Sequence, residues 1–168
     1  MTAAEHPDLV VESFGALFQR EFVKMVALAE AVSGDPAAAE DIAAEAFSRA
    51  NRRWDRVGGY DKPGAWVRRV TINLALKRKR RLSLERRSAE RHRAADLVEG
   101  PPEVDHPVWA EVAKLAPRQR VAVVLFYLED LPVAEIAEIM DCRVSTATSH
   151  LDRGRRTLAR RLGAGGAS

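Results

Sequence analysis

Prolines and turn residues divide residues 115–162 into three pieces, and this division constrains the fold of the chain more than any other feature. Pro117 and Pro132 each precede apolar residues at helical spacing, and proline is favoured at the first position of a helix. A break at 141–143 is followed by a third, longer apolar pattern that begins at Val144. The spacing therefore predicts three consecutive helices.

The second and third of these helices form a helix-turn-helix candidate. The small side chain of Ala137 lets them cross closely, and short polar residues early in the third helix let it enter a major groove. Arginines farther along can neutralise phosphates. We expect these residues to face DNA: Ser145, Thr146, Thr148, Ser149, His150, Arg153, Arg155 and Arg156. The pattern alone leaves open a helical bundle whose basic face is only solvated.

The first half of the chain contains three more helical patterns, within residues 13–82. At 33–36, Ser-Gly-Asp-Pro ends the first helix and starts the second, because glycine ends helices, Asp35 can cap and proline can begin the next. Pro63 opens the third helix, which runs into five consecutive cations at 77–81. Such a run is most often solvated or disordered. On a helix that also carries Arg68, Arg69 and Asn73, it favours a surface for polyanions.

The pattern predicts an all-α fold with two small helical domains, at 13–82 and 108–162. Residues 83–107 are predicted to form a flexible linker, because the prolines between 100 and 107 exclude a helix interior. Aromatic residues make up only 6% of the 168 residues, and β-branched alternation is scarce, which disfavours a sheet.

Composition and the absence of certain motifs also reduce the number of possible functions. Cys142 is the only cysteine, so no intrachain disulfide is possible, and we interpret it as a small core residue. No apolar run reaches the roughly 20 residues that span a membrane, and no signal peptide is recognisable, which predicts a cytoplasmic protein without membrane insertion. The four histidines are scattered, and no phosphate loop or nucleophile elbow is present. We therefore expect no enzyme activity, no metal and no cofactor.

Two sets of motifs make the chain resemble bacterial sigma factors of the sigma-seventy family, and in particular the extracytoplasmic-function group. In the second half, L-x-P-R-Q-R, Y-L-E-D-L and A-E-I-A-E-I follow one another with the spacing of the fourth sigma domain. In the first half, GDPAAAEDIAAEAFSRANRRW and KPGAWVRRVTINLALKRKRR resemble the second sigma domain. The resemblance implies a protein that directs core RNA polymerase to promoters.

The resemblance also implies roles for individual residues. The helix that carries Asp41, Glu45, Phe47 and Arg49 would dock on the clamp helices of RNA polymerase. The helix that carries Arg68, Arg69, Asn73 and Lys77 would read and melt the minus-ten promoter element, and the helix-turn-helix would read the minus-thirty-five element. Core RNA polymerase and promoter DNA are the implied partners, with an anti-sigma protein as inhibitor.

Some positions depart from the family pattern. Ala44 stands where a glutamine is usual and Asn51 where a tryptophan is usual, and both changes remove contact area from the docking helix. Thr148 replaces a frequent lysine in the helix-turn-helix, so the promoter sequence is not fixed by the resemblance.

A free-standing helix-turn-helix regulator is the alternative function. Such regulators usually dimerise on paired half-sites, yet no heptad pattern or dimer helix is apparent. That alternative also leaves the acidic docking helix and the basic helix after Pro63 unexplained, so the sigma-factor interpretation is favoured.

Overall fold

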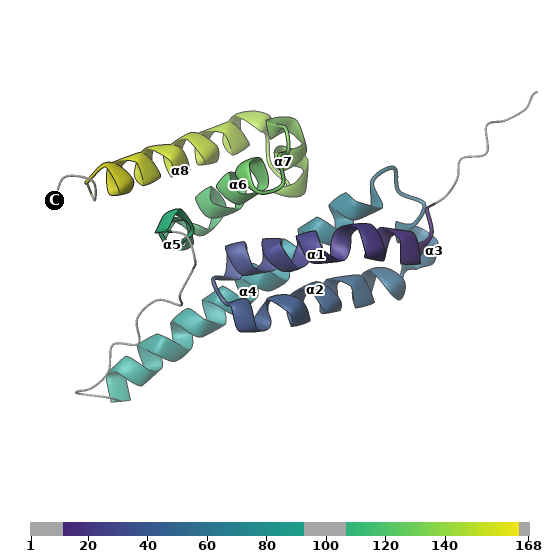
Figure 1. Ribbon diagram of the computed structural model, residues 1–168, viewed down its shortest axis with the longest axis horizontal. Helices are drawn as coiled ribbons and strands as arrows, with labels where there is room; N and C mark the ends of the chain where they lie inside the picture. The colour runs from purple at the N-terminus through teal and green to yellow at the C-terminus, as the bar shows by residue number, and fades with distance from the viewer. Residues whose placement is uncertain (1–11, 93–106, 165–168) are drawn as a thin grey trace, which may run out of the picture.

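The computed structural model describes residues 12–92 and 107–164, and every regular element within them is an α-helix. The helices are α1 (Phe14–Ser33), α2 (Pro36–Asn51), α3 (Trp54–Val57), α4 (Pro63–His92), α5 (Pro107–Ala113), α6 (Pro117–Tyr127), α7 (Val133–Ile139) and α8 (Val144–Ala164). The predicted all-α class with two small helical domains is confirmed (Figure 1). The part of the predicted linker at 93–106 lies outside the described residues.

The boundary between α1 and α2 forms as the turn residues predict. Gly34 adopts the left-handed conformation (φ 69°), and its N–H donates to the Glu30 carbonyl at 2.8 Å. The Asp35 carboxylate then accepts from the backbone N–H of Ala38 at 3.3 Å and caps α2. The two caps reverse the chain, so that α1 and α2 pack against each other (Figure 1).

An aromatic cluster fills one end of the first domain. Phe47 of α2 is 1% exposed, and Phe14, Phe18 and Phe22 of α1 surround its ring at centroid distances of 6.3, 5.0 and 5.8 Å. The predicted inward face of α2 is buried throughout: Ala39, Ile42, Ala43, Ala46, Phe47 and Ala50. α4 packs against both α1 and α2 and completes this core.

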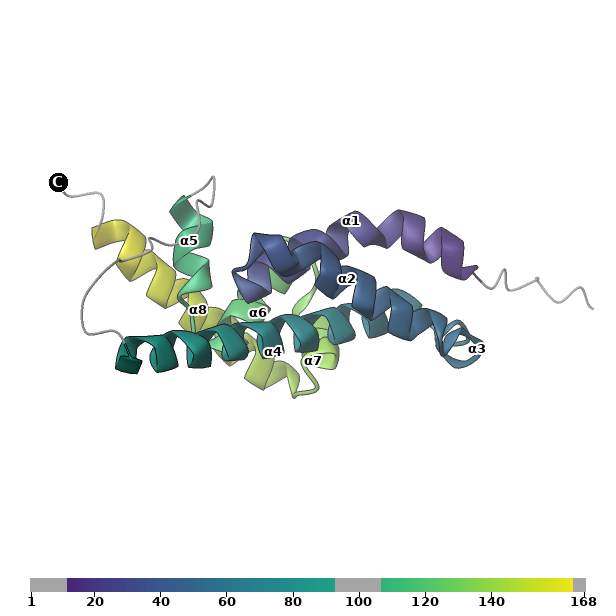
Figure 2. The same cartoon turned by 90° about the horizontal axis from the view of Figure 1, so that it is seen from below.

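α4 is longer than predicted. Residues 83–92 were expected to belong to the flexible linker, but they continue α4 to His92. Leucine, glutamate, arginine and alanine in this segment are strong helix formers. The ion pair between Arg81 and Glu85, four residues apart at 3.4 Å, gives local support. Figure 2 shows α4 as one continuous rod that extends well beyond the end of α2.

The second domain is built from α5 to α8, with α6 and α7 both packed on α8. Two apolar residues of this domain are exposed: Leu128 at 37% and Val144 at 51%. Both lie at helix boundaries, where the chain leaves the helical repeat that the pattern assumes. Gly154 is buried where α8 crosses α6.

The two domains pack on each other. α1 contacts α5 and α6, and α4 contacts α7 (Figures 1 and 2). Arg120 of α6 lies at this contact, 1% exposed, and its guanidinium donates to the carbonyl of Val32 in α1 at 2.9 Å. The elements therefore place α4, the helix predicted to face the promoter, against the helix-turn-helix.

Replacing Gly154 with alanine should destabilise the second domain. A Cβ at this position would lie 2.7 Å from Cγ2 of Val123, a buried side chain with little freedom to move. We expect a loss of about 1–3 kcal/mol in the free energy of unfolding, the usual cost of overpacking. Thermal or urea unfolding followed by circular dichroism measures it. Gly163→Ala is the control in the same helix, because nothing lies within 4 Å of its Cβ; equal stability of the two variants would contradict the prediction.

Candidate functional site

The exposed side of α2 carries the residues predicted to bind polymerase. Asp41 is exposed, and Glu45 accepts a hydrogen bond from Arg49 at 2.7 Å. This hydrogen bond, with the charges of Arg49 and Arg52, lowers the pKa of Glu45. Phe47 is a correction to the predicted set: its ring is buried in the aromatic cluster, so it supports α2 from beneath and offers no surface to a partner.

A shallow cavity adjoins this side of α2. Its volume is about 330 Å³, and it is lined by Glu45, Arg49, Arg52, Arg53, Trp66 and Val70. Trp66, interpreted from the sequence as core packing, is half-buried and packs against the core from α4. The cavity therefore lies between the C-terminal half of α2 and the first turns of α4, and its charged lining is mostly basic.

The basic face of α4 lies at the contact between the domains. Arg68 donates from Nη2 to Glu21 of α1 at 2.9 Å and from Nε to Glu129, in the turn between α6 and α7, at 2.8 Å. Arg69 donates to the carbonyl oxygen of Glu138 in α7. Of the four residues of α4 predicted to face DNA, these two contact the second domain. Arg69 nevertheless stays exposed, as do the other two, Asn73 and Lys77, so Arg68 is the one of the four that the contact covers.

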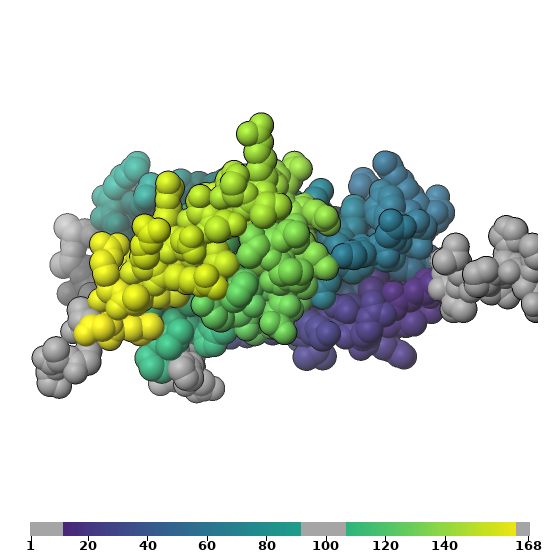
Figure 3. All heavy atoms as spheres, turned by 90° about the horizontal axis from the view of Figure 1, so that it is seen from above, coloured from purple at the N-terminus to yellow at the C-terminus, as the bar shows by residue number. Residues whose placement is uncertain are grey.

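The predicted DNA-reading residues of α8 gather on its outer side. Ser145, Thr146, Thr148 and Ser149 are all exposed, and Figure 3 shows α8 lying across the outside of the molecule. The Thr148 hydroxyl donates to the Val144 carbonyl at 2.9 Å, and the Ser149 hydroxyl donates to the Ser145 carbonyl at 2.9 Å. Each hydroxyl oxygen thereby keeps its lone pairs for a donor from outside, such as a base amino group.

The histidine and arginines of α8 differ in their surroundings. Burial, and then the charges of Arg118 and Arg153, lower the pKa of His150, so its ring is neutral near pH 7. Arg153 and Arg156 are exposed, and no described residue pairs with Arg156. They are free to approach a phosphate.

Arg155 is held by aromatic side chains of α6. Its guanidinium carbon lies 4.6 Å from the ring centroid of Phe126 and 5.5 Å from that of Tyr127, and its Nε donates to the Tyr127 hydroxyl at 2.9 Å. The sequence predicted Arg155 as a DNA contact equivalent to Arg156. These contacts give it a packing role that Arg156 lacks.

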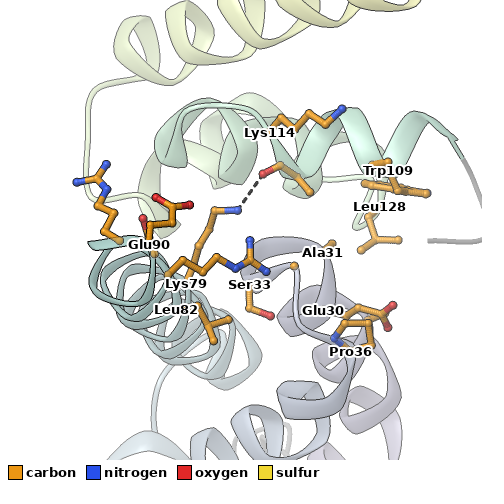
Figure 4. Close-up of a pocket in the computed structure, with 17 residues that line it drawn as sticks. Glu30, Ala31, Ser33, Pro36, Lys79, Leu82, Glu90, Trp109, Lys114 and Leu128 are labelled. Atoms are coloured by element: carbon orange, nitrogen blue, oxygen red, sulfur yellow. Dashed lines mark hydrogen bonds between the residues drawn. The ribbon is translucent and has the colours of Figure 1, made fainter. Parts of the chain in front are cut away.

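A larger cavity of about 570 Å³ opens between α1, α4 and α5, where the two domains meet (Figure 4). Leu82, Trp109 and Leu128 contribute apolar surface. Lys79 points across the gap in Figure 4 and donates to the Ala113 carbonyl at 2.9 Å. Burial, and then the charges of Arg120 and Arg86, lower the pKa of Lys79 to about 8.

Sequence reasoning missed the residues that join the domains, among them Glu21, Lys79 and Arg120. One signal was available for Arg120. The five residues after it, Val121 to Leu125, are all apolar and all buried, so the middle of this helix has no side that faces water. A helix segment with that pattern has to be covered all round, and the arginine next to it is buried with it.

Within the described residues, 12–92 and 107–164, no group of three or more histidine, cysteine, aspartate or glutamate side chains could hold a metal ion. No helix in those ranges has the length and apolar character needed to cross a membrane.

Comparison with known protein families gives two matches. "Sigma-70 region 2" matches residues 17–85, and "Sigma-70, region 4" matches residues 106–158. The ECF RNA polymerase sigma factor SigW of Bacillus subtilis is 30% identical over 155 residues, covering 83% of this chain and 83% of SigW. The ECF RNA polymerase sigma factor SigE of Mycolicibacterium smegmatis is 30% identical over 158 residues, covering 87% of this chain and 60% of SigE.

Two solved structures share the arrangement of helices. The sigma factor RpoE, in complex with the anti-sigma factor NepR from Bartonella quintana, superposes with a TM-score of 0.69 at 20% identity, covering 89% of this chain and 96% of RpoE. CnrH, in complex with the cytosolic domain of CnrY, superposes with a TM-score of 0.66 at 22% identity, covering 90% of this chain and 88% of CnrH. At these identities the likeness shows a shared fold.

Arg155→Ala should lower the melting temperature, whereas Arg156→Ala should not. The first change removes the stacking on Phe126 and the hydrogen bond to Tyr127, worth about 1 kcal/mol together, or about 2–4 °C for a chain of this length. The second removes an exposed side chain without a partner among the described residues, with an effect within about 0.5 kcal/mol. Thermal unfolding of both variants checks this, and equal melting temperatures would show that the stacking contributes nothing.

Lys79→Met should stabilise the chain more near neutral pH than in alkaline solution. Because the folded-state pKa, about 8, lies below the ordinary 10.5, wild-type stability falls as the pH drops from 10.5 towards 8. Methionine carries no charge at any pH. The melting temperature of the variant should therefore exceed that of the wild type by more at about pH 7 than at about pH 9.5. Lys24→Met, at an exposed position of α1, controls for the loss of a lysine. The same advantage at both pH values would contradict the burial effect.

Proposed function

The chain belongs to the sigma-70 family, in its extracytoplasmic-function group, and from this premise we propose how its surfaces are used. It is an RNA polymerase sigma factor that binds the core enzyme and directs promoter-specific initiation. One observation carries this conclusion: regions 2 and 4 occur in order in a chain that aligns with SigW over 83% of both proteins.

Residues 13–82, together with the rest of α4, form the part that we propose docks on core polymerase and opens the minus-ten element. The docking surface is the exposed side of α2, with Asp41, Glu45 and Arg49. Two observations support this proposal. The side chains are accessible to a partner, and an ion pair between Glu45 and Arg49 holds two of them in place.

Promoter recognition is divided between α4 and α8. Asn73 and Lys77, with Arg68 and Arg69, contact the minus-ten element, and the outer side of α8 reads the minus-thirty-five element. Hydroxyls and His150 of α8 reach base edges, and Arg153 and Arg156 bind phosphates. Each surface alone supplies few contacts, so affinity for DNA comes from both surfaces once polymerase fixes their spacing.

An anti-sigma protein is the regulatory partner that we propose. The support is that RpoE, which shares this fold, was solved in complex with the anti-sigma factor NepR. We place the protein in the cytoplasm, where polymerase works, and assign it no catalytic activity of its own, since the polymerase performs the chemistry.

Asp41→Lys should remove binding to core RNA polymerase. The change reverses a charge on the proposed docking surface without disturbing the core, because Asp41 is exposed. Co-elution with purified bacterial core polymerase by size exclusion, followed by run-off transcription on genomic fragments, measures it. We expect wild-type protein to co-elute and to create new start sites, with affinity reduced at least about tenfold in the variant.

Glu85→Lys makes the same change of charge on α4, at an exposed residue paired only with Arg81 at 3.4 Å, and serves as the control. Failure of the wild-type protein to bind polymerase, combined with tight binding of duplex DNA by the protein alone, would instead identify a free-standing helix-turn-helix regulator. Equal effects of the two variants would move the docking surface away from Asp41.

A further inference from the structure

We infer that the cavity between α1, α4 and α5 is a binding site for a small amphipathic anion, a molecule with an acidic head group and an apolar body. The inference goes beyond the proposed function and does not rest on it, because no residue that lines this cavity belongs to the proposed polymerase or DNA surfaces.

The cavity has the size and the walls of a site for a small molecule. Its volume is about 570 Å³, and such sites range from about 300 to 1,000 Å³. Every wall contributes apolar surface: Ala27 and Ala31 from α1, Leu82 from α4, and Trp109 and Ala110 from α5. Sites of this kind combine a mostly apolar lining with a few charged or polar groups that fix the orientation of the ligand. The charged groups therefore indicate which class of ligand fits.

Lys79 brings a cation without a counterion into this cavity. Its side chain is half-buried, and its Nζ donates to the Ala113 carbonyl at 2.9 Å. Among residues 12–92 and 107–164, no carboxylate pairs with Lys79 or with Arg86. Burial lowers the pKa of Lys79, and the charges of Arg120 and Arg86 lower it further, so three cations lie near one another. An anion beside Lys79 would offset their repulsion and accept a charge-assisted hydrogen bond.

The acidic residues of the lining do not neutralise this cation. Glu30 lies beside Pro36 in Figure 4, on the side of the cavity away from Lys79. Glu90 follows Lys79 by eleven residues in α4, which is about 16 Å along the helix axis. Cations outnumber carboxylates in the lining by four to two: Lys79, Arg86, Arg87 and Lys114 against Glu30 and Glu90. The lining therefore favours an anion over a cation.

The charged and the apolar parts of the cavity lie on different sides. Figure 4 shows the Lys79 side chain on one side and Trp109, next to Leu128, on the other. A ligand whose head group contacts Lys79 can therefore lay its apolar body against the ring of Trp109. Removing an apolar body from water and pairing an acidic head with a cation both favour binding, and a ligand needs both properties to use the whole cavity.

Octanoate is the probe, and octanol is its matched neutral control, because the two carry the same length of chain and differ in the head group. Isothermal titration calorimetry of the full chain at about pH 7 measures both. We expect octanoate to bind one site with a Kd below about 1 mM, and octanol to bind at least about tenfold more weakly. Amide chemical-shift changes caused by octanoate should concentrate in α1, α4 and α5.

Two variants separate the head group from the body. Lys79→Met keeps the length and the apolar stem of the side chain but removes the charge, so octanoate should bind about tenfold more weakly and octanol no more weakly than before. Leu82→Gln removes apolar surface from the wall, so it should weaken the binding of both ligands. Lys24→Met, at an exposed position of α1 outside the cavity, is the control and should bind both as wild type.

The second cation gives an independent pair of variants. Arg86→Gln should weaken octanoate binding by a smaller factor than Lys79→Met, because Arg86 is exposed and its charge is better screened by water. Arg80→Gln, at an exposed position of α4 outside the cavity, should leave octanoate binding unchanged. Circular dichroism checks that each variant remains helical.

The inference is supported if Lys79→Met weakens the binding of octanoate alone and Leu82→Gln weakens the binding of both ligands. Absence of octanoate binding at about 1 mM would overturn it, as would equal affinities for octanoate and octanol. Unchanged octanoate affinity in both variants would place the bound octanoate elsewhere on the chain and would also overturn it.

Discussion

The buried guanidinium of Arg120 is the interaction on which the arrangement of the two domains depends. It donates to the carbonyls of Val112 and Leu115 at 3.1 and 2.7 Å, and to that of Val32 at 2.9 Å. A buried cation without a carboxylate is tolerated only when its N–H groups are satisfied, and burial lowers its pKa to about 10. Since the carbonyls come from α1, from α5 and from the turn between α5 and α6, this one side chain ties both domains together.

The position of the second domain then determines which surfaces are accessible. The acidic side of α2 and the outer side of α8 are open, whereas the first turns of α4 contact α7 and the turn before it. This contact covers Arg68, whose side chain is 16% exposed, whereas Arg69, Asn73 and Lys77 of α4 stay exposed.

Local structure was predictable because it depends on nearest neighbours. The stop at Gly34 and Asp35 and the helix that opens at Pro63 follow from backbone conformation and capping alone. The apolar pattern also identified the buried side of α2. The apolar pattern indicates that a face of a helix is covered, but it does not indicate which element covers that face.

The features that were missed depend on distant contacts. Arg68 has the same chemistry whether its partner is Glu129 or a phosphate, and Arg155 and Arg156 look equivalent until the rings of α6 are in place. The family resemblance grouped Phe47 with the polymerase-binding residues of α2, but its ring is buried among the aromatic side chains of α1. The most direct test of the whole account is transcription by core RNA polymerase on genomic fragments, with and without the purified chain. The account predicts start sites that appear only when the chain is present; identical transcripts in both reactions would contradict it.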